Sequence, residues 1–166
     1  MEINEIVNKL GLIPHPEGGY YKETYRSKGT INKGSLNEDF SGKRSYCTGI
    51  YFLLTKNNFS AFHKIKSDEM WHFYQGSTLA VHIIDQEGNY TKKLLGNDFQ
   101  KNETPQFIVE KDQWFASCLE NEEDYALVGC TVSPGFDFED FELAERATLV
   151  NKFPEHQQII NELTRC

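Results

Sequence analysis

The sequence predicts an all-β fold, in which short strands pack as a sandwich or barrel and short helices lie only at the two ends. About eight runs rich in β-branched and aromatic residues follow one another closely between residues 44 and 132. Clusters of turn-forming residues separate these runs, for example Lys-Asn-Asn at 56–58 and Glu-Gly-Asn at 87–89. Helical periodicity is confined to the regions near the two ends. A middle so dense in hairpins, preceded by a long N-terminal arm, is typical of a jelly roll.

The N-terminal arm begins with a predicted helix over residues 4–12, with Asn4 as its N-cap and Gly11 as its stop. Two prolines and two glycines then interrupt all regular structure between residues 14 and 19. Residues 20–27 alternate between aromatic and polar side chains and are predicted to form a strand. Residues 28–43 are rich in Gly, Ser, Asn and Lys, which predicts an exposed loop.

The remaining elements follow in order from their apolar runs and the turns between them. The predicted strands are 45–55, 59–65, 69–74, 78–85, 90–95, 106–109, 113–117 and 125–132. Residues 155–163 place Ile159, Ile160 and Leu163 on one face of a last helix. Residues 139–150 fit neither pattern clearly.

Composition limits the classes of function. A chain of 166 residues is long enough for one domain with a full core. Its net charge of −8 repels phosphate groups, which argues against nucleic-acid and anionic-membrane partners. No apolar run reaches the roughly twenty residues that span a bilayer, and the acidic N-terminus does not resemble a secretory signal. We therefore expect a cytoplasmic protein whose four cysteines (47, 118, 130 and 166) are free thiols.

The densest functional stretch is FSAFHKIKSDEMWHFYQG at 59–76, and it resembles the first motif of the cupin superfamily. His63, Glu69 and Gly76 match that motif, whereas Ile65 stands in place of its second histidine. In the second motif, Trp114 and the residue after it stand where a histidine is usual. Longer matches at 15–27, 59–76 and 130–144 identify the chain as similar to the small, uncharacterised "cupin 5" branch, which resembles dTDP-sugar epimerases in fold.

This resemblance implies a single cupin domain over 1–166, a double-stranded β-helix that forms a jelly-roll barrel. Residues 1–45 are then a helix and arm, 46–134 the barrel core, and 135–166 a C-terminal segment with a helix. It also implies a homodimer and a small polar, anionic or sugar-like molecule in the barrel. It leaves the activity open, because a fold does not determine a function.

Two kinds of chemistry are compatible with His63 and Glu69. A cupin metal site needs three or four converging ligands. The substituted motifs leave His63 and Glu69, with His72 and Gln106 as possible replacement ligands. We therefore expect no cofactor, with a weakly held divalent metal at His63 and Glu69 as the exception. A pocket histidine oriented by a carboxylate can instead act as a base near neutral pH. The favoured hypothesis is thus a metal-independent sugar or sugar-nucleotide epimerase or isomerase. The alternatives are a metal-dependent cupin enzyme such as an oxygenase, and a non-catalytic binding module.

The candidate ligand-binding residues are aromatic or polar side chains expected near the barrel. They are Tyr20, Arg26, Tyr51, Ser60, Trp71, His72, Tyr74, Gln106, Trp114 and Asp137. Strict alternation places Trp71 on the same strand face as Glu69 and His72 on the opposite face. Arg26 can bind an anionic group through its planar guanidinium, whereas Arg44 is expected at the surface.

Overall fold

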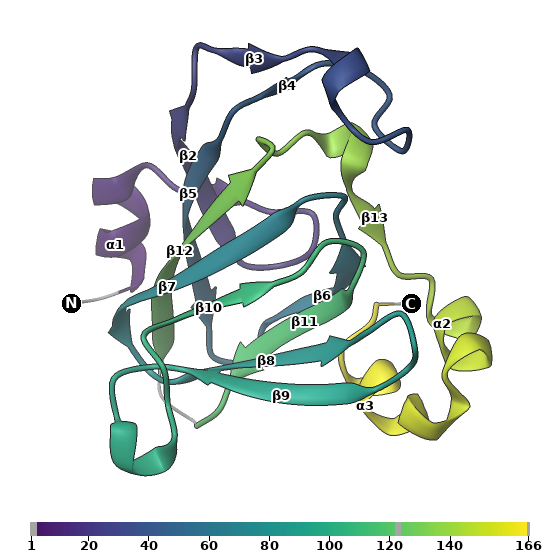
Figure 1. Ribbon diagram of the computed structural model, residues 1–166. Helices are drawn as coiled ribbons and strands as arrows, with labels where there is room; N and C mark the ends of the chain where they lie inside the picture. The colour runs from purple at the N-terminus through teal and green to yellow at the C-terminus, as the bar shows by residue number, and fades with distance from the viewer. Residues whose placement is uncertain (1–2, 122–123, 166) are drawn as a thin grey trace.

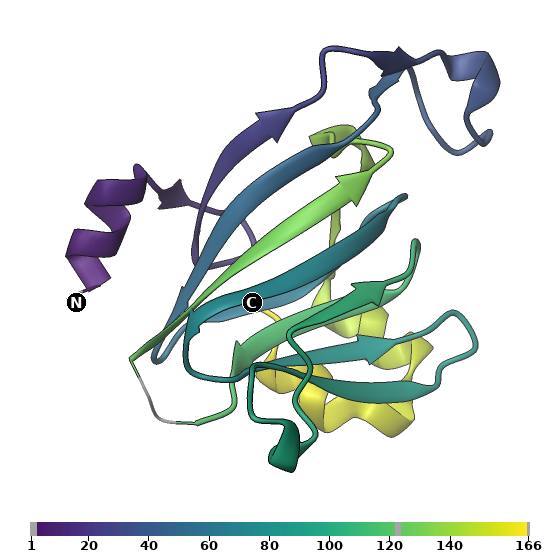
Figure 2. The same ribbon diagram turned by 60° about the vertical axis from the view of Figure 1, so that its left-hand side comes forward.

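Two antiparallel β-sheets face each other and form the jelly roll, as the sequence predicts (Figure 1). The computed structural model describes residues 3–121 and 124–165, which contain thirteen strands. One sheet has the strand order β1-β2-β5-β12-β7-β10 and the other the order β13-β6-β11-β8-β9. The short strands β3 and β4 form a separate ribbon that extends away from the barrel (Figure 2).

The strands lie close to their predicted positions. The six-stranded sheet consists of β1 (Ile13–Pro14), β2 (Tyr20–Arg26), β5 (Thr48–Thr55), β12 (Tyr125–Ser133), β7 (Asp68–Gly76) and β10 (Gln106–Val109). The five-stranded sheet consists of β13 (Glu142–Leu143), β6 (Phe59–Lys64), β11 (Trp114–Leu119), β8 (Leu79–Ile84) and β9 (Tyr90–Leu95). The ribbon consists of β3 (Thr30–Ile31) and β4 (Arg44–Ser45).

The core lies between the two sheets because alternate side chains of each strand point inward. Phe52 of β5, Trp71 of β7 and Phe115 of β11 are almost completely buried, and Trp71 contacts both phenylalanines edge to face. Leu79 and Val81 of β8, in the same sheet as Phe115, complete this cluster. Such burial of large apolar side chains supplies most of the favourable free energy of folding.

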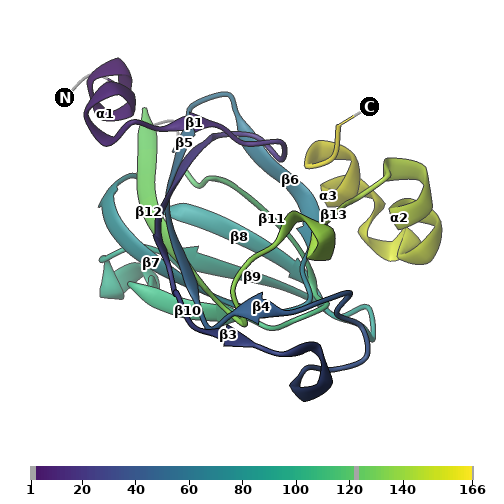
Figure 3. The ribbon, with the colours of Figure 1, turned by 90° about the horizontal axis from the view of Figure 1, so that it is seen from above.

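The helices cover the outer faces of the sheets (Figure 3). Helix α1 (Ile3–Leu10) packs Ile6 against Leu53 of the six-stranded sheet. Helices α2 (Arg146–Lys152) and α3 (Gln157–Glu162) pack on the five-stranded sheet around Phe62. In the described part of the chain, no helix has the length and apolar character that crossing a membrane requires.

Short strands and 3₁₀ turns account for most of the differences from the sequence-based assignment, and Asn4, the predicted N-cap, lies inside α1. The predicted loop at 28–43 contains β3 and the turn η1 (Lys33–Ser35). The ambiguous region 139–150 divides into the end of η3 (Phe138–Asp140), β13 and the start of α2. The last helix begins later than predicted, because Pro154–His156 forms the turn η4 before α3.

The placement of Arg44 at the surface was wrong. Only 4% of Arg44 is exposed, and its guanidinium forms two hydrogen bonds of 2.7 Å with the buried carboxylate of Asp140. Asp140 lies 96 residues away from Arg44 in the sequence, in η3, so no local sequence pattern could predict this ion pair. Cys47, Cys118 and Cys130 are free thiols, as expected, whereas Cys166 lies outside the described residues.

Candidate functional site

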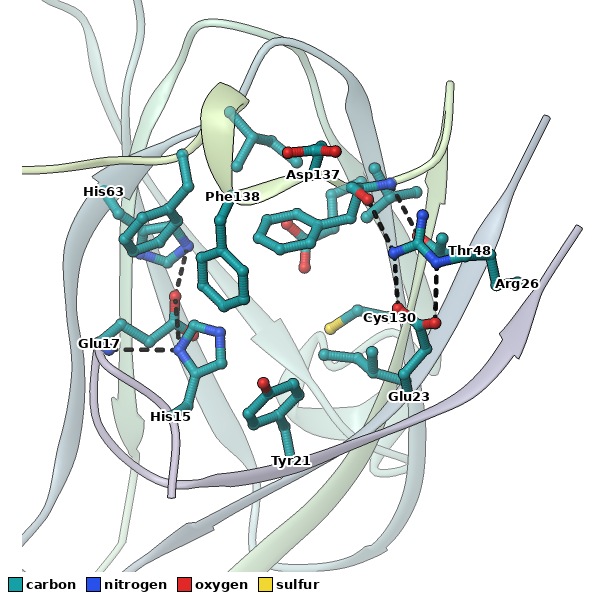
Figure 4. Close-up of a pocket in the computed structure, with 16 residues that line it drawn as sticks. His15, Glu17, Tyr21, Glu23, Arg26, Thr48, His63, Cys130, Asp137 and Phe138 are labelled. Atoms are coloured by element: carbon teal, nitrogen blue, oxygen red, sulfur yellow. Dashed lines mark hydrogen bonds and ion pairs between the residues drawn. The ribbon is translucent and has the colours of Figure 1, made fainter. Parts of the chain in front are cut away.

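A cavity of about 480 Å³ opens between the sheets at the end of the barrel where β7 begins (Figure 4). Its walls come from five strands, from the turn between β1 and β2, and from the segment that follows β12. The lining residues are His15, Glu17, Tyr21, Glu23, Arg26, Thr48, Ile50, His63, Ile65, Glu69, Cys130, Val132, Phe136, Asp137, Phe138 and Phe141. The apolar core described above fills the other end of the barrel.

Strand alternation explains most of these positions. Tyr21 and Glu23 are two residues apart on β2, as are Thr48 and Ile50 on β5, so each pair projects from one face. On β7 the same alternation directs Glu69 into the cavity. The hydroxyl of Tyr21 points toward the centre of the cavity (Figure 4).

The turn between β1 and β2 brings His15 and Glu17 to the cavity. Gly18 and Gly19 both have positive φ, +115° and +76°. A Cβ atom at Gly18 would overlap the carbonyl oxygen of Phe59, so only glycine fits there. The turn is held to β6 because the amide of Ala61 donates a 2.8 Å hydrogen bond to the carbonyl of Glu17.

His63 and Glu17 form a buried pair at the wall of the cavity. Nδ1 of His63 lies 2.7 Å from the carbonyl oxygen of Ala61, which can only accept, so Nδ1 carries a proton. Nε2 lies 2.9 Å from Oε2 of Glu17. A hydrogen bond at that distance needs a second proton, carried either by Nε2 or by the carboxyl group. The pair therefore binds an exchangeable proton next to the cavity.

Electrostatics favour the charged form of this pair. Burial opposes the imidazolium, but Glu17, Glu69 and the Ala61 carbonyl outweigh it, so the pKa of His63 lies above its ordinary value. Burial likewise opposes the carboxylate, but His63 and His15 outweigh it, so the pKa of Glu17 lies below its ordinary value. Both directions place the shared proton on His63.

His15 plays a different part in the same cluster. Burial lowers its pKa more than the neighbouring Glu17 raises it, so the neutral form is favoured. Its Nδ1 accepts a 3.2 Å hydrogen bond from the backbone amide of Glu17, and this leaves the ring proton on Nε2. His15 thus fixes the conformation of the turn that carries Glu17.

Glu69 is the second carboxyl group in the cavity and differs from Glu17. Burial raises its pKa to about 7, and the charge of Glu17 adds to this, whereas His63 acts in the opposite direction. A carboxyl group with this pKa is present in both protonation states near neutral pH, so it can donate or accept a proton there. Burial raises the pKa of the neighbouring Cys130 thiol, which keeps that thiol protonated.

Three phenylalanines cover the cavity from the segment after β12. Phe141 lies against the ring of His63 at a centroid distance of 5.3 Å, and Phe138 stacks on His15 at 6.0 Å. Phe136 contacts Phe138 edge to face at 5.0 Å. Phe138 is 49% exposed, so it forms the outer edge of this cover.

Arg26 and Glu23 form an ion pair at the mouth of the cavity, on the side opposite the His63–Glu17 pair (Figure 4). Nε and Nη2 of Arg26 donate hydrogen bonds of 2.9 and 2.7 Å to the two carboxylate oxygens of Glu23. Nη2 also donates to the carbonyl of Phe136, and Nη1 donates to Ser45. Asp137 lies close enough to raise the pKa of Arg26 further, although the hydrogen bonds to Glu23 are the main cause.

A family model described as Cupin superfamily (DUF985) matches residues 4–144 of the chain. The chain belongs to this family. It is 33% identical over 148 residues to the uncharacterized protein YML079W of Saccharomyces cerevisiae, an alignment that covers 83% of this chain and 73% of that protein.

Several solved structures are similar to this chain. Protein SO0799 of Shewanella oneidensis is 38% identical, with a TM-score of 0.88 over 99% of this chain and 98% of that one. A hypothetical protein from Leishmania major is 32% identical, with a TM-score of 0.89 over the whole of both chains. Oxalate decarboxylase from Bacillus subtilis is 13% identical, with a TM-score of 0.55 over 90% of this chain and 36% of that one, which shows a shared fold alone.

The cupin barrel brings four of the residues selected from sequence to the cavity: His63, Glu69, Arg26 and Asp137. Their roles there stay predictions. The others do not line the cavity. Trp71 lies on the same strand face as Glu69, as alternation predicts, but is buried in the core behind the cavity.

The remaining candidates point elsewhere in the barrel. Tyr51 and Tyr74 contact each other edge to face, and Tyr20 packs near helix α1. His72 hydrogen-bonds Gln106 and Thr131 on the other face of β7. Ser60 is buried and does not line the cavity, but its side chain lies next to Glu17 and contributes to the lowered pKa of that carboxyl group. Trp114 packs beneath the C-terminal helices with Lys64 over its ring.

Sequence reasoning assigned no site role to Glu17, Tyr21 or Glu23. The sequence pattern that could have indicated Glu17 is an acidic residue between a proline and two glycines. Such a turn holds its side chains in defined directions. The signal for Tyr21 was strand alternation, which separates it from the selected Tyr20.

The cupin motifs raise the question of a metal, and the side chains do not fit one. Within residues 3–121 and 124–165, no three His, Cys, Asp or Glu side chains are grouped as metal ligands. Nδ1 of His63 is bound to a carbonyl and Nε2 faces Glu17, so neither nitrogen points toward a shared ligand position with Glu69.

The raised pKa of Glu69 predicts a stability that depends on pH. Between pH 4.5 and about 7 the folded chain keeps a proton on Glu69 that the unfolded chain loses, so wild-type stability falls as pH rises through this window. Glu69→Gln removes this loss, and we expect it to stabilise the protein by up to about 3 kcal/mol near pH 8 and to change little near pH 5.

Urea denaturation at both pH values measures this difference. The matched control is Glu142→Gln, a substitution of a carboxylate that is 60% exposed and whose effect should be small at both pH values. Equal effects of Glu69→Gln at the two pH values would show that Glu69 titrates normally.

Proposed function

We propose that this cupin binds a small polar, sugar-like carbonyl compound in the cavity and moves a proton at a carbon next to the carbonyl, as an isomerase or epimerase does. The observation that carries the proposal is the buried His63–Glu17 pair, which holds an exchangeable proton at the wall of a cavity large enough for one sugar ring. Glu69, with a pKa of about 7, lies at the same wall.

The groups divide the reaction between them. The His63–Glu17 pair, once it has lost its shared proton to solvent, accepts the proton of the substrate carbon. The electrons of the broken C–H bond move to the carbonyl oxygen. Protonated Glu69 donates a hydrogen bond to the resulting enolate.

A proton must then return to carbon. Return from the His63–Glu17 pair to the former carbonyl carbon gives an isomer, in which Glu69 gives its proton to the former carbonyl oxygen and takes the hydroxyl proton from the carbon that becomes the new carbonyl. Return to the same carbon from the opposite face gives an epimer, and the hydroxyl of Tyr21 points into the cavity from another wall (Figure 4). The phenolate of Tyr21 would regain its proton from water.

Deuterium wash-in tests this function. The protein, treated with EDTA, is incubated in D₂O with a panel of aldoses, keto sugars and nucleotide sugars, and label next to the carbonyl is followed by NMR. We expect incorporation into at least one compound, and a rate about 10² to 10⁴ lower for His63→Gln. Glu142→Gln, which is outside the cavity, should retain the rate.

Two results would contradict the proposal. Tight binding of a panel member without exchange would favour a binding module. Stoichiometric metal that is lost in His63→Ala, together with activity that EDTA abolishes, would favour a metal-dependent enzyme.

A further inference from the structure

The charges around the cavity are unsuited to an anion. Among the described lining residues, Arg26 is the only lysine or arginine, and His63 is the only histidine whose pKa is raised. Four carboxyl groups face them: Glu17, Glu23, Glu69 and Asp137. The net charge of −8 on the whole chain adds to the repulsion of an approaching anion.

Arg26 is also occupied. Glu23 accepts hydrogen bonds from two of its nitrogens in the fork geometry that a phosphate or carboxylate ligand would require. The carbonyl of Phe136 and the hydroxyl of Ser45 accept from the same guanidinium. An anion at Arg26 would have to displace Glu23 and then lie beside its carboxylate.

The neighbouring groove does not offer an alternative site for a phosphate. It meets the cavity at Ile65 and Phe141. Five acidic residues line it (Asp39, Asp112, Glu139, Asp140 and Glu142), against three lysines (Lys64, Lys66 and Lys152). Lys64 is paired with Glu142 at 3.0 Å, and Lys66 donates to the carbonyl of Asp39.

We infer that Glu23 is a specificity-determining residue that makes the cavity reject anionic ligands, so that the molecule bound there is uncharged or cationic. Combined with the proposed function, on which this extension rests, the substrate class is a free sugar or amino sugar with a carbonyl group. Sugar phosphates and nucleotide sugars are excluded, because their phosphates would lie among carboxylates at the mouth. The rejection of anions by Glu23 does not itself depend on any turnover.

Titration with inorganic phosphate tests the role of Glu23 directly. The ¹⁵N–¹H signal of Arg26 Nε is followed at constant ionic strength in the wild type, in Glu23→Gln and in Glu142→Gln. The control Glu142→Gln makes the same change in net charge and also releases a cation, Lys64, but outside the cavity. Glu23 is 39% exposed, and glutamine has its shape, so Glu23→Gln is compatible with the fold.

We expect saturable binding of phosphate at Arg26 in Glu23→Gln, at least about tenfold tighter than in the other two proteins. Equal binding in the wild type and Glu23→Gln would overturn the inference, and so would the absence of binding in Glu23→Gln.

The wash-in panel gives separate information: a lack of exchange in every sugar would contradict the proposed function and leave the phosphate result intact. Faster exchange in a nucleotide sugar than in its parent sugar would contradict the substrate class.

Discussion

Replacing Glu17 with glutamine is expected to lower the pKa of His63 by at least about one unit and to slow proton exchange by about 10² to 10⁴. The carboxylate lies 2.9 Å from Nε2 of His63 and is the main group that raises this pKa against the effect of burial. Without its charge, burial dominates and the imidazole becomes neutral. A neutral imidazole with a lowered pKa is a weaker base, so it accepts the proton of the substrate carbon more slowly.

Two measurements separate this role from a structural one. The ring ¹⁵N shifts of His63 give its pKa, and deuterium wash-in gives the rate. Glu17→Asp keeps the charge and should preserve part of the pKa shift, whereas Glu142→Gln should leave both quantities unchanged. A Glu17→Gln protein with an unaltered His63 pKa would show that the pair is not coupled as described.

Replacing Arg44 with alanine is expected to reduce the free energy of unfolding by about 3 kcal/mol. Asp140 would keep its buried carboxylate without the two 2.7 Å hydrogen bonds that now compensate its loss of water. Asp140 ends the turn η3, which begins at Phe138 and is followed by Phe141. The substitution should therefore also loosen the aromatic cover of the cavity.

The size of this effect is judged against an exposed ion pair. Lys64→Met breaks the bridge between Lys64 and Glu142, whose side chains are 29% and 60% exposed, and this loss should cost less than about 1 kcal/mol. The double variant Arg44→Met/Asp140→Leu removes both buried charges and should recover much of the loss. Urea denaturation of the three variants and the wild type gives the change in the free energy of unfolding. A loss for Arg44→Ala no greater than the loss for Lys64→Met would contradict a stabilising role for the buried Arg44–Asp140 pair.

Proximity along the chain decided which parts of the site the sequence could reveal. His63 and Glu69 lie six residues apart within one recognisable motif, so both were selected as site residues. Glu17 lies 46 residues before His63, and only the turn at Gly18 and Gly19 brings its side chain to Nε2. Trp71 was placed on the correct strand face, but alternation cannot tell how far along the barrel the core ends and the cavity begins.

The sequence by itself determined the long strands of both sheets, their inward faces and the cupin membership, because alternation, turns and motifs are local properties that a single segment carries. The tertiary structure alone decided the charges of the site. It brings His63 next to Glu17 and raises the pKa of Glu69 by burial. It also pairs Arg44 with Asp140, and Arg26 with Glu23 at the mouth of the cavity. Such effects depend on distance and burial between residues from different strands and turns, and these are established only when the two sheets close around the cavity.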